Sequence, residues 1–494
     1  MQDASRLGCA GFEILGLLTL CGLYILTWGS GEPALATLVN LLGAFCYGAL
    51  LTAGAWRTLR VSTNAIWTPL FWFRFTAATF YGLGAMVTFI APDQTVASIL
   101  GWYAYTQEEL LKVNLLNAAA TLVLLLAVRV MGGLLALWLE RRPDKHGAAG
   151  WAALPAVDLP QCASVFLGVG LFVRYFLELP HQFAMLDFVL PGIVMQLRNF
   201  AYVGLFIAFV LAFRGFRSWA MVASGILAAE ALVSLLTFGK QDTLVTLLMP
   251  VLAAFTVSHS RRALALGLVG LLAVYVAIKP VSDFGRVEIQ RMRGNITQAT
   301  LSERFEILAR FSYADAEADA QAHVPMAWLA RLNYAGPQAF ALSLRERGIE
   351  ATSFERAYYA LIPRLLWPDK PLVTALGSEI TYLARGFNTS STGISIFAEA
   401  YWNHGVLGVV LWTIHAGIVY LVYAAYAFRV MRSRSYWFLP VVLLGILSGY
   451  THSADFVPTF IGGAAQAIVI HFALKLAASW LARLTLRPTD ERLA

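Results

Sequence analysis

The chain is poor in charge. Only 13% of its 494 residues are Asp, Glu, Lys or Arg, against about 25% in ordinary soluble domains. Hydrophobic residues make up 59% of the chain, and its mean hydropathy is +0.66. The surface of a soluble domain needs more charged side chains than this chain contains. The composition therefore excludes an ordinary soluble protein.

Cysteine is also scarce, and familiar catalytic motifs are missing. The cysteines lie in or beside apolar stretches and form neither a disulfide framework nor a metal-ligand spacing; they are Cys9, Cys21, Cys46 and Cys162. No P-loop, dinucleotide-binding glycine motif or zinc-protease motif stands in a suitable context. No small-residue cleavage site follows the first apolar stretch, so we expect no cleavable signal peptide. We also expect neither a metal nor a cofactor.

Long apolar stretches occupy most of the chain. A bilayer core about 30 Å thick requires about 20 residues of helix. The expected fold class is therefore an all-α polytopic membrane protein with about twelve transmembrane helices. The expected spans are residues 9–28, 33–55, 69–91, 112–139, 161–179, 190–213, 218–238, 242–258, 263–279, 403–428, 436–450 and 457–481.

Basic residues in the short loops predict the orientation. One set of alternate loops carries many of them, including Arg57, Arg60, Arg141, Arg142, Arg214, Arg217, Arg261, Arg262, Arg429 and Arg432. The opposite short loops contain only Lys240. By the positive-inside rule both termini should be cytoplasmic. The net charge of +7 is thus explained by loops between spans, and we expect no nucleic-acid partner.

A single polar block interrupts the apolar pattern. The segment from Pro280 to Gly393 contains 12 basic and 12 acidic residues. It divides the chain into an N-terminal bundle of about nine helices (1–279), a large outer loop (280–392), and about three C-terminal helices with a cytoplasmic tail (393–494). Chemistry in such a protein is expected where the insert meets the bilayer, so we expect the loop to hold the substrate site.

The insert is predicted to be mostly helical, with breaks. Apolar residues recur at helical spacing from Leu301 to Tyr313, where Ser302 is expected to anchor the helix start. Short helices are expected at 325–331 and 354–361. The run from Ile362 to Pro371 contains three prolines and therefore cannot form a regular helix.

Arginines gather just after the ninth span. Arg286 and Arg293 are expected on one helix face, together with Gln290, and Arg291 lies between them. Guanidinium groups present planar donor forks to phosphate oxygens, so these arginines suit a lipid-linked diphosphate. The alternative is ordinary contact with anionic lipid.

Other basic residues are weaker candidates for the same role. They are Arg364 and Lys370 in the proline-rich run, Arg198 near the outer end of a span, and Lys240. The alternative for Arg364 is a pair with Asp369. Ionisable residues within spans are costly in lipid and should face the bundle interior; they include Arg74, Arg174, Glu178 and Glu230. We expect Arg174 to pair with Glu178, and Glu230 to join a buried network.

Acidic and imidazole side chains are expected at the outer ends of the last spans. Glu399 and His452 could each act as general base for a hydroxyl nucleophile if burial or a neighbour tunes the pKa. Asp455 lies at the same boundary. The alternative for each is a polar contact at a helix end.

Several motifs together resemble one family. They are Gly239-Lys240, the long outer loop, the run Ile362-Pro363-Arg364-Leu365-Leu366-Trp367-Pro368-Asp369-Lys370-Pro371, the segment Ser390-Ser391-Thr392-Gly393, and the segment from Ala398 to Gly408. This combination resembles bacterial Wzy-type polymerases, which polymerise O-antigen or exopolysaccharide repeat units. Many relatives carry Arg where this chain has Lys240, and Phe where it has His404.

The resemblance implies a metal-independent, GT-C-like glycosyltransferase of the bacterial inner membrane, with the large loop in the periplasm. It implies transfer of a growing glycan from undecaprenyl diphosphate to a sugar hydroxyl of an incoming lipid-linked repeat unit. Arg364, Glu399 and His452 would be catalytic, and the other basic candidates would bind diphosphate. Trp328, Tyr334 and Trp402 would stack on sugars. Membrane lipids and a chain-length regulator protein are the further partners it suggests.

Two other functions remain open from the sequence. An O-antigen ligase would use the same donor but pass the glycan to a lipid A core, and the sequence does not reveal the acceptor. A transporter or flippase of lipid-linked sugars would be favoured by repeated halves. No internal repeat is apparent in the sequence, which favours a transferase.

Overall fold

Helices joined by turns and irregular segments form the described chain. The structure is a computed structural model, and it describes residues 7, 8, 10–140, 157–183, 185–186, 190–293, 299–312, 326–362, 366–367, 369–370, 375–386 and 391–485. No strand occurs in these ranges. The predicted all-α class is therefore confirmed for the part of the chain that the structure describes.

Eleven of the described helices are long and apolar enough to cross a membrane. They coincide with eleven of the twelve predicted spans. The remaining predicted span, 436–450, corresponds to the shorter apolar segment Tyr436–Thr451. The chain is thus a multi-pass membrane protein.

The chain divides into two compact units, whose limits differ from those of the three predicted regions. Unit 1 comprises 1–156, 329–362 and 366–494, and unit 2 comprises 157–328 and 363–365. The polar insert is therefore shared: its first part packs within unit 2, and most of the rest within unit 1. The predicted regions followed hydropathy along the chain, whereas the units follow packing in space.

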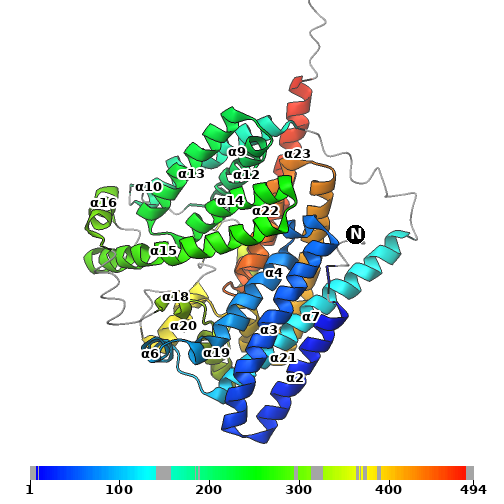
Figure 1. Ribbon diagram of the computed structural model, residues 1–494, viewed down its shortest axis with the longest axis vertical. Helices are drawn as coiled ribbons and strands as arrows, with labels where there is room; N and C mark the ends of the chain where they lie inside the picture. The colour runs from blue at the N-terminus through cyan, green and yellow to red at the C-terminus, as the bar shows by residue number, and fades with distance from the viewer. Residues whose placement is uncertain are drawn as a thin grey trace, which may run out of the picture. The chain divides into compact units, whose positions relative to one another are not determined.

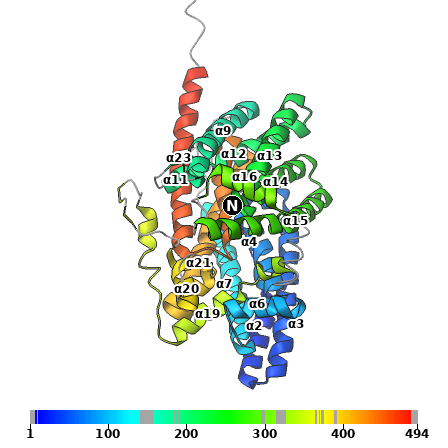
Figure 2. The ribbon, with the colours of Figure 1, turned by 90° about the vertical axis from the view of Figure 1, so that its left-hand side faces the viewer.

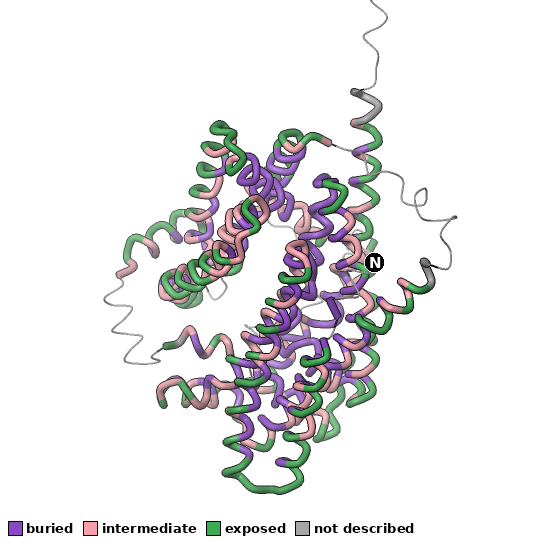
Figure 3. The backbone as a smooth tube through the Cα atoms, turned by 45° about the vertical axis from the view of Figure 1, so that its right-hand side comes forward, coloured by how far each residue is buried: buried purple, intermediate pink, exposed green. Residues whose placement is uncertain are grey.

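Unit 1 consists of a helical bundle and the insert helices that pack on it. Helix α7 packs against α2, α3 and α21, and α2, α3 and α4 lie side by side in Figure 1. Figure 3 shows the exposed connection between α2 and α3. The elements are α2 (Gly11–Ser30), α3 (Pro33–Val61), η1 (Thr63–Trp67), α4 (Pro69–Ala77), η2 (Ala78–Leu83), α5 (Gly84–Ile90), α6 (Asp93–Trp102), α7 (Gln107–Glu140), α19 (Ala335–Glu346), η5 (Ala357–Leu361), α20 (Ala375–Arg385), α21 (Ile396–Arg432), η6 (Tyr436–Phe438), α22 (Leu439–Thr451) and α23 (Val457–Thr485).

Unit 2 is built around one buried helix. Helix α12 is apolar on all sides, and every residue from Asn199 to Leu211 is buried, as expected of a helix without a polar face. It packs against α9, α13 and α14, which surround it in Figure 2. The elements are α9 (Leu159–Val173), η3 (Arg174–Glu178), α10 (Leu179–Gln182), α11 (Gly192–Leu197), α12 (Asn199–Phe213), α13 (Arg217–Thr237), α14 (Lys240–Ser258), α15 (Arg261–Arg293) and α16 (Leu301–Arg310). The short α18 (Ala327–Ala330) contains the division between the units.

Two helices run past the ends predicted from hydropathy. Helix α15 continues through Pro280 to Arg293, so the predicted end at residue 279 is the end of its apolar part only. Helix α21 begins at Ile396 but is interrupted at His404 and Gly405. Gly405 has φ 60°, a conformation that favours glycine. The predicted span start at residue 403 therefore lies next to this break.

The start of α16 corrects one local prediction. Thr300, and not Ser302, is the N-cap, and Glu303 completes a capping box with it. The Thr300 amide donates to the Glu303 carboxylate at 2.8 Å. The expected helices elsewhere in the insert are present but shorter, as α18 and the 3₁₀ turn η5.

Candidate basic site at the α13–α14 turn

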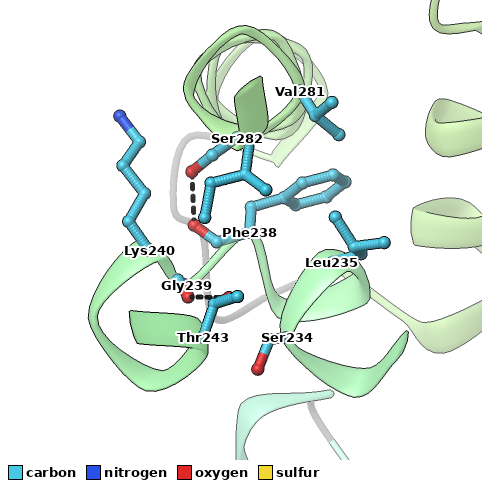
Figure 4. Close-up of a pocket in the computed structure, with 9 residues that line it drawn as sticks. Ser234, Leu235, Phe238, Gly239, Lys240, Thr243, Val281 and Ser282 are labelled. Atoms are coloured by element: carbon cyan, nitrogen blue, oxygen red, sulfur yellow. Dashed lines mark hydrogen bonds between the residues drawn. The ribbon is translucent and has the colours of Figure 1, made fainter. Parts of the chain in front are cut away.

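The turn between α13 and α14 has an unusual backbone. Phe238 adopts a left-handed conformation with φ 52°, and Gly239 is the N-cap of α14 without a side-chain cap. The Ser282 hydroxyl donates to the Phe238 carbonyl at 2.6 Å, as Figure 4 shows. The Phe238 ring packs directly against Gly285 of α15. Helix α15 therefore holds this turn from one side.

Basic side chains contact the turn from α14 and α15. Arg286 donates from Nε to the Phe238 carbonyl at 3.1 Å. Lys240, the first residue of α14, pairs with Asp283. Lys279 reaches the other oxygen of the same carboxylate at 2.5 Å. A small pocket opens here, lined by Phe238 and Lys240 among others (Figure 4).

A buried ionic network continues from the first turn of α14. Asp242 accepts from Arg174 at 3.2 Å and lies 3.5 Å from Arg198. Arg174 also contacts Glu178 at 3.1 Å and Glu230 at 3.4 Å, and Arg198 pairs with Glu178. The predicted pairing of Arg174 with Glu178 and the network role of Glu230 are confirmed.

One further arginine reaches the same turn from α16. Arg304 is 1% exposed and donates from Nη1 to the Leu236 carbonyl at 3.3 Å. Burial lowers the pKa of Arg304 to about 10, so the guanidinium remains charged at neutral pH. Sequence reasoning missed Arg304, although it lies on the apolar stripe formed by Leu301, Leu308 and Phe311. A charge on such a stripe was the available signal.

The basic side chains of α14, α15 and the network form what we call the basic cluster: Arg174, Arg198, Lys240, Lys279 and Arg286. Four carboxylates partly balance it: Glu178, Glu230, Asp242 and Asp283. A helix N-terminus carries a partial positive charge and unsatisfied amide groups. Cations beside the α14 N-terminus are therefore unfavourable alone, and an anion would stabilise the arrangement.

The other predicted phosphate ligands that the structure describes have partners of their own. Arg291 is 72% exposed and pairs with Glu288, and Arg293 pairs with Glu303 of α16. Lys370 donates to the carbonyls of Tyr359 and Ile362 at 3.0 and 2.7 Å, which holds its own loop. Arg364 lies outside the described residues.

The ion pair between Arg293 and Glu303 changes the pKa of Glu303. The guanidinium of Arg293 and the Thr300 amide lower the pKa of Glu303 to about 2. Glu303 is therefore ionised at any physiological pH. It supports the start of α16 and the end of α15 simultaneously.

Glu399 in unit 1 is fully buried, at 0% exposure. Its Oε2 accepts from the Val457 amide at 2.6 Å, which is the first residue of α23. A carboxylate at this position satisfies an unpaired amide and stabilises the helix N-terminus. The contact is therefore of the helix-end type.

His452 is also fully buried in unit 1. Its Nδ1 lies 2.8 Å from the Tyr420 hydroxyl, and its ring packs edge-on to Phe73 and Phe397. Burial lowers the pKa of His452 to about 3, so the imidazole is neutral. Burial also raises the pKa of the neighbouring Asp455.

The three aromatic residues expected to stack on sugars differ in exposure. Trp402 is fully buried, and its indole donates to the Ile349 carbonyl at 2.7 Å; this burial argues against a sugar-stacking role. Trp328 is half-buried on α18. Tyr334 is half-buried and packs edge-on to Phe80 at 5.2 Å.

Among the described residues, no group of three or more His, Cys, Asp or Glu side chains could hold a metal ion. Comparison with known proteins adds no assignment: no family model, no curated protein and no solved structure matches the chain. The function is therefore inferred from the sequence and from this geometry.

Proposed function

We propose that this protein is a membrane glycosyltransferase that polymerises lipid-linked oligosaccharide repeat units, as its resemblance to Wzy-type polymerases suggests. The donor is a glycan on undecaprenyl diphosphate, and the acceptor is a sugar hydroxyl of the next lipid-linked unit. The reaction takes place at the periplasmic face of the inner membrane, in a GT-C-like membrane scaffold.

A single observation carries the proposal. Three basic residues expected to bind diphosphate, Arg198, Lys240 and Arg286, come from separate helical segments and gather around the α13–α14 turn. Lys240 begins a helix long enough to span a bilayer, Arg198 lies in the first two turns of another, and Arg286 lies about two turns before the end of a third. A diphosphate anchored by a lipid tail must be bound at such a boundary. Convergence of cations on a helix N-terminus is the arrangement that an anionic leaving group requires.

The basic cluster accounts for the leaving-group chemistry. The acceptor hydroxyl forms a bond to the anomeric carbon while the bond from that carbon to the diphosphate oxygen breaks. The diphosphate departs with the bonding electron pair, and guanidinium and ammonium groups stabilise the charge that develops. The carboxylates of Asp242 and Asp283 hold these cations in place between reactions.

The acceptor hydroxyl must also lose a proton. Oε2 of Glu399 accepts from the Val457 amide at the α23 N-terminus, so we assign this carboxylate to positioning that helix. His452, in unit 1, is kept as the candidate base from the sequence: within the described structure its Nε2, like Oε1 of Glu399, makes no hydrogen bond. Burial lowers the pKa of His452 to about 3, so it accepts a proton only when a bound acceptor raises that pKa. Because His452 is fully buried, this role requires the acceptor to reach it. Half-buried Trp328 and Tyr334 remain the candidates for sugar stacking.

The test is chain extension by the purified full-length protein. Lipid-linked repeat units are added in detergent or liposomes, and products are separated on a gel, where polymerisation appears as a ladder. Replacing Arg198, Lys240 or Arg286 singly with Gln should lower the extension rate about a hundredfold, because each removes a charged donor from the leaving group. Arg291→Gln is the matched control, since Arg291 is exposed and paired locally.

Two results would overturn the proposal. A wild-type protein that forms no ladder, but attaches glycan once when a lipid A core is supplied, is a ligase. Wild-type extension rates in all three variants would show that the α13–α14 turn takes no part in the reaction. Folding of each variant is checked by its thermal unfolding midpoint in detergent.

A further inference from the structure

Arg304 joins three segments that are distant in sequence. Its Nε donates to the Ala299 carbonyl at 3.2 Å, its Nη1 to Leu236 at 3.3 Å and its Nη2 to Gln182 at 3.2 Å. The guanidinium carbon lies 5.3 Å from the centre of the Phe183 ring. One planar group therefore ties α16 to the ends of α10 and α13.

The Leu236 carbonyl is the contact that lies beside the α13–α14 turn. Leu236 lies in the last turn of α13, directly before left-handed Phe238 and the N-cap Gly239. A cation at a helix C-terminus also complements the helix dipole. Arg304 thus fixes α13 at the point where the chain turns into α14.

A simple packing role does not require an arginine here. Residue 304 belongs to the apolar stripe of α16, and Ile307 is buried beside it. A leucine or methionine would fill that stripe without the cost of burying a charge. The planar fork instead fixes the directions of three carbonyls at once, which a flexible ammonium does not do.

We propose that Arg304 is a positioning residue for the diphosphate site: it holds the α13–α14 turn so that Lys240 and the N-terminus of α14 face the phosphates. This inference rests on the proposed function for the identity of the ligand. The structural part of the inference, that Arg304 holds the α13–α14 turn, can be measured without any ligand.

The experiment uses the full-length protein in detergent and inorganic pyrophosphate as the probe. Binding is measured by calorimetry, and hydrogen exchange is followed in the peptide covering 236–243. Arg304→Lys keeps the charge and loses the fork. It should weaken pyrophosphate binding about tenfold or more, because charge-assisted hydrogen bonds that orient the turn are lost. Exchange at 236–243 should accelerate in the same variant.

Arg310→Gln is the matched control, because Arg310 is a half-exposed arginine on the same helix. It should bind pyrophosphate as the wild type does, with unchanged exchange at the turn. If Arg304→Lys does not fold, Phe183→Leu keeps the guanidinium but removes the ring that packs on it, and it should show the same changes at smaller amplitude.

The outcomes separate the two proposals. A wild type that does not bind pyrophosphate overturns the diphosphate site and the proposed function with it. A wild type that binds, together with an Arg304→Lys protein that binds equally well and exchanges equally slowly, overturns the positioning role alone. Weaker binding without faster exchange at the turn would also contradict it, since the effect would then not pass through α13.

Discussion

The guanidinium of Arg174 lies 3.2 Å from the carboxylate of Asp242 and shares it with Arg198. The two arginines come from different helical segments, and Asp242 lies in the first turn of α14. Both also contact Glu178. Asp242 therefore links the α14 N-terminus to the buried charges of unit 2.

Asp242→Asn should destabilise the protein. The substitution leaves one buried guanidinium group, that of Arg174, and one partly buried group, that of Arg198, with less negative charge around them. Breaking a buried pair is costly because the remaining charge stays desolvated. Since Glu178 still partners both arginines, we expect a loss of about 2 kcal/mol. The measurement is thermal unfolding in detergent. Glu288→Gln, which removes the partner of exposed Arg291, should change stability by less than about 0.5 kcal/mol; similar shifts in both variants would refute the network's importance.

Gly285→Ala should disturb the α13–α14 turn. A methyl group at Gly285 would overlap the ring of Phe238, which is 1% exposed. We expect a loss of about 1–3 kcal/mol together with weaker pyrophosphate binding. Gly270→Ala on the same helix meets no atom within 4 Å and should be neutral. Equal behaviour of the two alanine variants would show that the Phe238 contact is unimportant.

Glu399→Gln should fold normally and extend chains within about threefold of the wild-type rate, because an amide oxygen can still accept from the Val457 amide. Glu399→Ala should instead lose about 1–3 kcal/mol of stability, because the buried amide is left without an acceptor. Unfolding midpoints and ladder assays on both variants test this. A stable but inactive Glu399→Gln protein would restore the carboxylate as general base.

His452 should make stability fall at acidic pH. Its folded pKa of about 3 lies below the value of about 6.5 expected in the unfolded chain. The unfolded state therefore binds a proton that the folded state excludes as the pH drops from about 6.5 towards 3. This group alone contributes a loss of up to about 1.4 kcal/mol per pH unit in that window.

The measurement is the unfolding midpoint between pH 7.5 and 4.5. His452→Gln should flatten its pH dependence, because glutamine does not titrate. His259→Gln, which alters an exposed loop residue, should leave the slope unchanged. If the unfolding midpoint of His452→Gln depends on pH as that of the wild type does, another group causes the loss of stability at acidic pH.

The membrane-spanning helices could be predicted from sequence because each contains enough apolar residues to cross a bilayer. Their ends were harder to place. Helix α15 continues past Lys279 because a polar segment can extend a helix into water as readily as end it. Helix α21 starts before its apolar run because Ser395 caps it and Asn403 is held by Ser353.

The types of residue in the candidate site could be predicted from the sequence, but which residues come together there could not. Arg198, Lys240 and Arg286 were chosen for charge and predicted depth, yet only the packing of α12, α14 and α15 brings them to one turn. Trp402 is an aromatic residue of the type that stacks on sugars, but it is fully buried and its indole donates to the Ile349 carbonyl. Arg304 could have been suspected from its place on an apolar stripe, but its three acceptors come from non-local packing.

Helix α15 is 33 residues long, about 50 Å at 1.5 Å per residue, whereas a hydrocarbon core is about 30 Å thick. Because the helix is continuous, the direction in which its arginines point is fixed by the number of residues in its apolar half. Inserting or deleting a single amino acid near its beginning would swing Arg286 about 100° around the axis and away from Phe238. Insertions and deletions in this helix should consequently be poorly tolerated, even at positions that only contact lipid.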